Sequence, residues 1–221
     1  TAFKRMRGAD VVLHTATLHK PHLVTHSRQQ FVDTNVSGTL TLLEEAVRAA
    51  VRAFVFTSST SAFGSALRPP DDSPAAWITE DVAPVPKNIY GVTKVAAEDL
   101  CELFSRKRGV NCVVLRTSRF FPDEDDDAQA RREYADANIK ANEFLFRRVD
   151  IDDVVDAHLL AIENARRIGF GRFIISATTL FRPTDVRELR SDAAAVVERY
   201  VPQYRAVYER LGWRMFRALD R

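Results

Sequence analysis

Short apolar runs alternate with longer helical segments along this chain, and this alternation is the feature that most restricts its fold. Residues 10–15, 53–57 and 110–116 are rich in β-branched and aromatic side chains and have the length of buried strands. Between them, residues 27–50 and 89–108 carry apolar side chains at helical spacing. Strands joined by long helices form right-handed β-α-β units of a parallel sheet. The sequence therefore predicts an α/β fold with a parallel sheet flanked by helices.

The second half of the chain is predicted to be mainly helical. Helical spacing covers residues 135–147, 152–166 and 192–211, and residues 172–176 have the pattern of a further strand. Asp152 or Asp153 is expected to cap the second of these helices, and Thr184 a short later helix. The acidic run 123–127 is interpreted as a solvated loop.

Tyr90 and Lys94 lie four residues apart near the start of the helix predicted over 89–108, which places both side chains on one face. A phenol with a pKa near ~10 is a poor base at neutral pH, and a neighbouring ammonium group lowers that pKa. Such a tyrosine can exchange a proton with a hydroxyl group while a nicotinamide exchanges a hydride. The spacing alone favours an exposed helical pair, because Tyr and Lys fall at this spacing by chance in many helices.

A run of hydroxyl side chains, residues 57–61, follows the second predicted strand. The carboxyl ends of parallel strands are where α/β folds place their active sites. There Ser59 is a candidate to hydrogen-bond a substrate oxygen and orient it toward Tyr90. A Ser/Thr-rich turn is the alternative. The presence of both features on successive β-α units favours an active site.

These segments resemble the NAD-dependent epimerase/dehydratase family of extended short-chain dehydrogenases. Members carry a strand of the form F-x-F-S-S-S-A-T-V-Y-G and then Y-G-x-[ST]-K, where this chain has FVFTSSTSAFG (54–64) and YGVTK (90–94). Four shorter segments also match: LHTA (13–16), NVSGT (35–39), LRTSR (115–119) and VDIDDVVDA (149–157). The resemblance covers roughly residues 8–176.

The resemblance implies a Rossmann-like fold and a role for each matched residue. Tyr90 takes the place of the catalytic base, Lys94 of its partner and Ser59 of the catalytic serine. The cofactor, NAD or NADP, is expected to contact Ala16, Asn35, Thr57, Tyr90, Lys94 and Ser118. The expected partners are a small-molecule substrate, with a nucleotide sugar as a candidate, and a second copy in a homodimer formed through helices 27–50 and 89–108.

The family's glycine-rich pyrophosphate loop does not occur among the 8 glycines of this chain. We therefore expect a fragment, truncated at both ends, whose sheet lacks the first β-α-β units. Residues 1–122 are predicted to form a partial NAD(P)-binding domain with the catalytic residues. Residues 123–221 are predicted to hold the last Rossmann elements and part of a substrate-binding lobe.

Three departures from the family leave the substrate and the reaction open. His19 stands where relatives commonly have lysine, Phe63 replaces a tyrosine, and residues 118–127 differ from the usual substrate-side segment. The reaction could thus be that of an epimerase, a dehydratase or a reductase. An inactive fragment and a nucleotide-sensing binding module of the same fold are the alternatives to an enzyme.

Composition excludes other classes of protein. A net charge of +2 does not indicate binding to nucleic acid, and the apolar runs are too short to span a membrane. Without an apolar leader near residue 1, a cytoplasmic protein is expected. Cys101 and Cys112 lack metal-ligand spacing, so we expect no metal site and two reduced, buried thiols.

Overall fold

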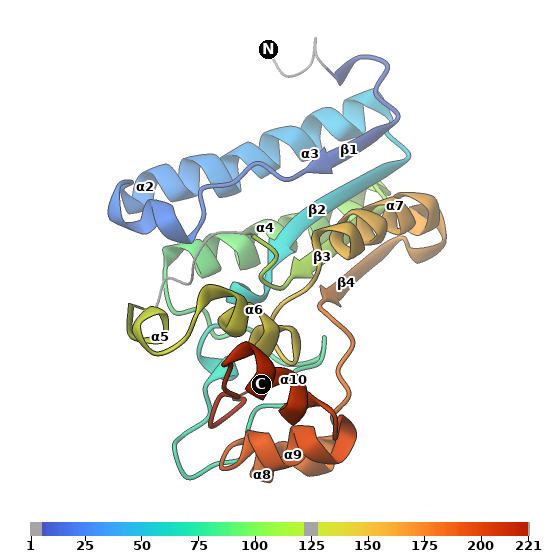
Figure 1. Cartoon of the computed structure of the whole chain (residues 1–221). Coiled ribbons are helices and arrows are strands. Elements are labelled where there is room, and N and C mark those ends of the chain that lie inside the picture. Colours follow the sequence, from blue (N-terminus) through green and yellow to red (C-terminus); the bar gives the residue numbers. More distant parts are fainter. Residues whose placement is uncertain (1–5, 122–127, 221) are drawn as a thin grey trace. The chain divides into compact units, whose positions relative to one another are not determined.

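The computed structural model, which describes residues 6–121 and 128–220, contains a parallel sheet of four strands (Figure 1). The strands lie side by side in the order of the chain: β1 (Val11–His14), β2 (Ala53–Ser59), β3 (Cys112–Thr117) and β4 (Phe170–Ile175). The four predicted strands are confirmed, with ends that differ by up to two residues. The predicted α/β, Rossmann-like fold class is confirmed as well.

The helical stretch predicted over 27–50 is continuous but changes its winding. It comprises α2 (Arg28–Phe31), a π-helical turn η2 (Val32–Ser37) and α3 (Gly38–Ala49). Ser27 begins it with a capping box, because its Oγ accepts from the Gln30 backbone N–H at 3.2 Å while the Gln30 side chain accepts from the Ser27 N–H.

Helix α4 (Ile89–Arg108) has the predicted bounds. Asn88 caps its start, and Gly109, with a φ of 71°, ends it in the left-handed conformation that glycine adopts easily.

Side chains of β2 alternate between two apolar clusters, one on each face of the sheet. On one face Phe54 and Phe56 pack with residues of α3 and α4, among them Leu43, Ala46, Ala97 and Cys101. On the other face Ala53 and Val55 pack with Ala161 and Ala165 of α7 (Ile151–Ile168). Helices therefore cover both faces, which explains why the strands read as unbroken apolar runs.

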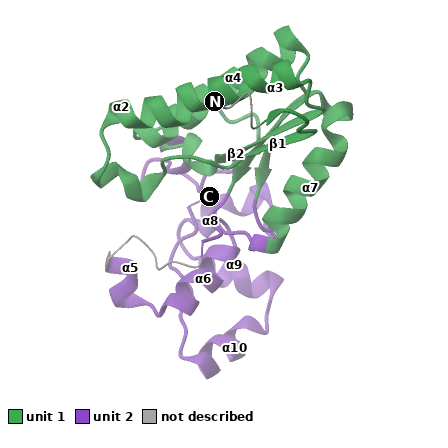
Figure 2. Ribbon diagram, turned by 90° about the horizontal axis from the view of Figure 1, so that it is seen from above, with its two compact units in different colours: residues 1–64, 80–117, 152–175 green, residues 65–79, 118–151, 176–221 purple. Residues whose placement is uncertain are grey.

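The chain divides into two compact units (Figure 2). The first contains the sheet and is drawn from Thr1–Gly64, Glu80–Thr117 and Asp152–Ile175. The second is drawn from Ser65–Thr79, Ser118–Ile151 and Ser176–Arg221, and its named elements are helices and helical turns. The division of roles between residues 1–122 and 123–221 remains a prediction.

The helices of the second unit are α5 (Ala128–Glu133), α6 (Asp136–Phe144), α8 (Val186–Leu189), α9 (Ala193–Tyr200) and α10 (Tyr204–Leu211). The helix predicted over 192–211 is two helices, because Pro202 lacks the N–H that a continuous helix needs. The core of the second unit contains Phe181, Leu189, Val196 and Leu219, all buried.

Two capping predictions are wrong. Helix α7 begins at Ile151, so Asp152 and Asp153 lie inside its first turn. Their negative charges interact favourably with the helix dipole there. Thr184 lies within a short 3₁₀ turn η5 (Pro183–Asp185), and Asp185 occupies the N-cap position of α8. The acidic run 123–127 lies outside the described residues.

The long segment 59–87 contains short 3₁₀ turns at η3 (Thr60–Ala62) and η4 (Ser65–Leu67). Cys101 and Cys112 are buried and not bridged to each other, as predicted.

Candidate active site

Ser59 and Tyr90 meet at the carboxyl end of β2. Ser59 is the last residue of the strand and lies beside the phenol of Tyr90, which is 7% exposed and whose pKa the Ser59 hydroxyl lowers. Asn88 accepts a hydrogen bond from the Gly91 N–H at 3.0 Å, which fixes where α4 begins. Because Tyr90 lies in the first turn of α4, this cap also positions its phenol. Two of the three predicted catalytic residues are therefore neighbours at this strand end.

Gly91 allows this close approach of helix and strand end. A Cβ atom at this position would lie 2.9 Å from the Ser61 carbonyl oxygen and 3.1 Å from the Pro86 side chain. Because Gly91 has no side chain, the first turn of α4 can lie directly against the loop that follows β2.

Lys94 is almost fully buried one turn further along α4, with 2% of its surface exposed. Its Nζ donates a hydrogen bond to the Thr57 carbonyl oxygen at 2.7 Å and lies 4.5 Å from the centre of the Phe56 ring. Burial lowers the pKa of Lys94 to about 8, while the nearby Glu98 and Cys101 act in the opposite direction. Lys94 and Thr57 are therefore in direct contact at this edge of the sheet.

Burial raises the pKa of Tyr90 above 10.0, and the Ser59 hydroxyl opposes this rise only in part. The predicted lowering of this pKa by Lys94 is therefore wrong for the chain by itself. The physical reason is that the phenol is removed from water, which disfavours the phenolate.

His14, at the end of β1, is buried beside Lys94. Its Nε2 lies 2.8 Å from the Thr39 hydroxyl, which itself donates to the Asn35 carbonyl at 2.6 Å, so Nε2 carries the proton and donates. Burial, and then the charge of Lys94, lowers the pKa of His14 to about 4. The ring is therefore neutral at pH 7.

Acid should destabilise this protein through His14. Its pKa falls from 6.5 in the unfolded chain to about 4 in the folded chain, so the stability it contributes is present above pH 6.5 and lost as the pH falls to about 4. The loss corresponds to about 3 kcal/mol. Urea unfolding at pH 7, 5 and 4 should show a smaller acid loss for His14→Gln than for the unmodified protein. Parallel pH profiles of the two proteins would contradict this expectation.

Asn35 uses its whole side-chain amide within the chain. Its Oδ1 accepts from the Leu18 N–H at 2.7 Å and from the Thr17 hydroxyl at 3.0 Å. Its Nδ2 donates to the Leu18 carbonyl at 2.9 Å and to the Thr93 hydroxyl at 3.0 Å. Asn35 therefore ties the segment after β1 to α4, so a predicted contact with the cofactor would have to replace one of these bonds.

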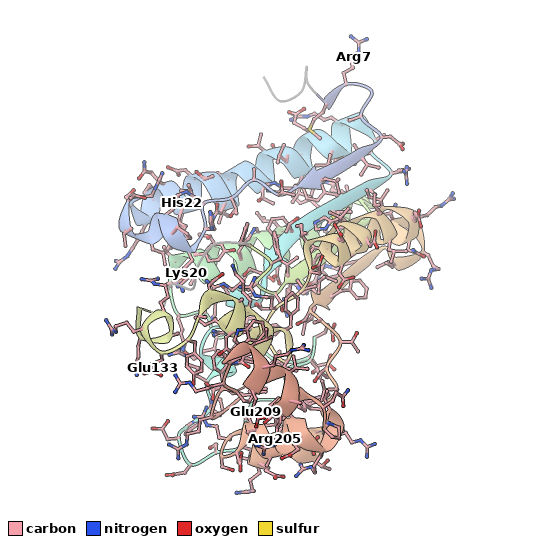
Figure 3. The ribbon with its side chains drawn as sticks, in the orientation of Figure 1. Arg7, Lys20, His22, Glu133, Arg205 and Glu209 are labelled. Carbon is pink, nitrogen blue, oxygen red and sulfur yellow. The ribbon has the colours of Figure 1, made fainter. Side chains whose placement is uncertain are left out.

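The other predicted cofactor contacts lie in different settings. Ala16 is exposed just after β1, and Thr57 is partly buried at the end of β2. Ser118 is buried in the second unit, so its relation to Ser59, Tyr90 and Lys94 stays a prediction. His22 and Lys20 lie on the 3₁₀ turn η1 (Lys20–Val24) that follows β1 (Figure 3).

Three polar residues beside the site were not predicted. Glu98 is fully buried, binds Arg116 of β3 through two side-chain nitrogens, and accepts from the Ser58 hydroxyl. His158 of α7 hydrogen-bonds the Thr57 hydroxyl at 2.7 Å. The four-residue spacing from Lys94 could have indicated Glu98. His158 is 101 residues from Thr57, and the sequence carries no signal for that contact.

Gly64 ends the short segment that follows Ser59, and its replacement should lower the stability of the fold. Its φ is 53°, and a Cβ atom there would lie 2.1 Å from the Val85 carbonyl oxygen. Gly64→Ala is expected to lower the free energy of unfolding by about 3 kcal/mol or more, the sum of left-handed strain and overpacking. Gly109→Ala is the control, with a similar φ but open space around its Cβ, and should cost about 1–2 kcal/mol. Equal losses in urea unfolding would rule out the packing explanation.

Comparison with known proteins agrees with this fold. The model of the NAD dependent epimerase/dehydratase family matches residues 1–175, and the chain belongs to that family.

Two curated relatives and one solved structure show how far the likeness extends. The UDP-glucose 4-epimerase of Rhizobium meliloti is 34% identical over 105 residues, covering 48% of this chain and 30% of the relative. Cinnamoyl-CoA reductase 1 of Petunia hybrida is 27% identical over 212 residues, covering 90% and 58%. A Bacillus cereus UDP-glucuronic acid 4-epimerase structure has a TM-score of 0.60 at 24% identity, covering 79% and 56%. The chain thus spans about a third to three fifths of these proteins.

No helix within residues 6–121 and 128–220 combines the length and apolar character needed to cross a bilayer. The same residues contain no group of three or more His, Cys, Asp or Glu side chains arranged to hold a metal ion.

Proposed function

We propose that this chain carries the catalytic residues of an NAD(P)-dependent oxidoreductase of the epimerase/dehydratase type. The observation that carries the proposal is the position of Ser59, at the carboxyl edge of the parallel sheet, beside the buried Tyr90, whose pKa it lowers. Lys94 supports it, because its ammonium group is anchored at the same strand end. Serine, tyrosine and lysine at one sheet edge suit proton exchange with a hydroxyl or carbonyl group.

The residues present fit the nicotinamide end of such a cofactor. Within the described residues Lys94 donates one hydrogen bond, to Thr57, which leaves two N–H groups for ribose hydroxyls. Ala16 is exposed just after β1. Lys94, Tyr90, Thr57, Ala16, Asn35 and Ser118 would hold the cofactor, which when bound accepts or supplies the hydride.

Tyr90 would move the proton at its Oη atom. Because burial raises its pKa, the phenol is protonated at neutral pH, which is the form that donates to a carbonyl oxygen. The Ser59 hydroxyl acts in the opposite direction on this pKa and favours proton removal when a hydroxyl group is oxidised. Ser59 would also orient the substrate oxygen toward the phenol.

A nucleotide sugar is the first candidate substrate, since UDP-glucose 4-epimerase is the name of a relative that is 34% identical over 105 residues. A reductase acting on a carbonyl compound is the second candidate. The cinnamoyl-CoA reductase relative favours it, because that match covers 90% of this chain. A homodimer formed through the helical stretch 27–50 and α4, and a cytoplasmic location, belong to the same proposal.

A cofactor and substrate panel tests the function. The purified protein is titrated with NAD(H) and NADP(H) by calorimetry and then assayed for hydride transfer with UDP-sugars, aldehydes and acyl-CoA thioesters. Turnover with any member supports the proposal and names the substrate class. Cofactor binding without turnover would favour a nucleotide-sensing module, and neither binding nor turnover would favour an inactive fragment.

A further inference from the structure

We propose that His158 is a positioning residue for Lys94 and acts on it through Thr57. Three hydrogen bonds, each 2.7 Å long, connect the Val154 carbonyl, the His158 ring, the Thr57 residue and the Lys94 ammonium in that order. The inference rests on the proposed function, since it gives Lys94 its purpose. It adds a residue that lies outside the Ser59, Tyr90 and Lys94 set.

The direction of each hydrogen bond follows from the chemistry of the groups. The Val154 carbonyl can only accept, so His158 Nδ1 carries a proton and donates to it. In the neutral ring Nε2 is then an acceptor, and the Thr57 hydroxyl donates to it. His158 is thereby held in one tautomer and one orientation by its own helix, as an orienting histidine requires.

Thr57 connects the two faces of the sheet. Its side chain follows Ala53 and Val55 to the face that α7 covers, where His158 lies. Its carbonyl accepts from Lys94 of α4, the helix that covers the opposite face. Because Thr57 stands two residues before the end of β2, its hydroxyl bond to His158 restrains the strand end on which both Lys94 and Ser59 depend.

The other contacts between α7 and the sheet differ in kind from the contact that His158 makes. The helix packs on the sheet through Ala157, Ala161, Ile162 and Ala165, which are apolar contacts without directional preference. His158 adds a directional bond at the strand end that carries the candidate catalytic groups. Directional bonds are what hold a reacting group in position, and a displacement of 1 Å can lower a rate by up to ~100-fold.

Two substitutions separate the two bonds of His158. His158→Asn keeps a donor at the place of Nδ1 for the Val154 carbonyl but does not reach Thr57. His158→Gln places an amide oxygen where Nε2 accepts from Thr57. We expect His158→Asn to lower kcat about 10-fold with little change in the substrate KM. His158→Gln should keep most of the kcat of the unmodified protein. Thr57→Val should match His158→Asn, and the double variant should be no worse than either single variant.

A second measurement does not depend on turnover. In ¹⁵N-labelled protein the His158 ring should show the Nδ1–H tautomer, and the Lys94 side-chain ammonium signal should shift in His158→Asn and Thr57→Val but not in His158→Gln. Thermal melting identifies any variant that has unfolded. If His158→Asn has unfolded, the Thr57→Val result replaces the His158→Asn result.

The outcomes separate this inference from the proposed function. If the unmodified protein lacks turnover while the Lys94 signal responds as described, the proposed function fails and the link from His158 to Lys94 stands. An unchanged Lys94 signal in folded His158→Asn and Thr57→Val, or equal loss of kcat in His158→Asn and His158→Gln, would overturn the inference.

Discussion

Tyr90→Phe is expected to remove turnover while leaving the fold and the affinity for the cofactor intact. The substitution deletes only the phenolic oxygen that would donate or accept the proton, and with it the interaction with Ser59. Loss of a positioned proton donor lowers rates by about 10²–10⁴-fold. The measurements are the initial rate of hydride transfer with the best substrate of the panel and calorimetric titration with the cofactor.

Tyr204→Phe is the matched control for this prediction. Tyr204 is also buried, and its hydroxyl donates to the Ala194 carbonyl at 3.3 Å within the second unit. The same chemical change there should leave the rate unaltered. A Tyr90→Phe protein that turns over at the rate of the unmodified protein would eliminate the proposed mechanism, whereas lost cofactor binding would point to structural damage.

Glu98→Gln is expected to be the most destabilising of the single substitutions considered. The Glu98 carboxylate is fully buried and pairs with Arg116, which is 3% exposed, at 2.7 Å, and with Arg172 at 3.2 Å. Without this negative charge the Arg116 guanidinium remains buried and uncompensated, which costs about 3–5 kcal/mol. Urea unfolding at pH 7 measures the loss.

Glu102→Gln is the control, because Glu102 pairs with the same Arg172 at 2.8 Å but its side chain is 38% exposed. An exposed ion pair contributes about 0–1 kcal/mol, so this substitution should have a small effect. If the two variants lost equal stability, burial would not be what makes Glu98 important.

The elements of this fold could be predicted because each is encoded locally. Apolar periodicity placed the strands of the sheet, and Gly109 marked the end of α4. The errors came where local signals compete or are weak. Pro202 divides one amphipathic stretch into two helices, and helix α5 went unpredicted because it is short and polar.

The candidate site was predictable only for residues that carry a spacing or a motif. Tyr90 and Lys94 share a helix, and Ser59 ends a strand, so the rules of parallel sheets place them near one edge. His158 carries no such pattern, because its partner Thr57 is 101 residues away in the sequence and is brought to it only by packing on the sheet.

By itself the sequence determined the sheet, its covering helices and the family, and it predicts the Ser59, Tyr90 and Lys94 set, because these depend on periodicity and motif. Only the tertiary structure decided the protonation of that set. Burial of the phenol raises the pKa of Tyr90 and burial of the ammonium lowers that of Lys94 to about 8. Both effects arise from removal of water by residues far apart in the chain, which no local pattern encodes.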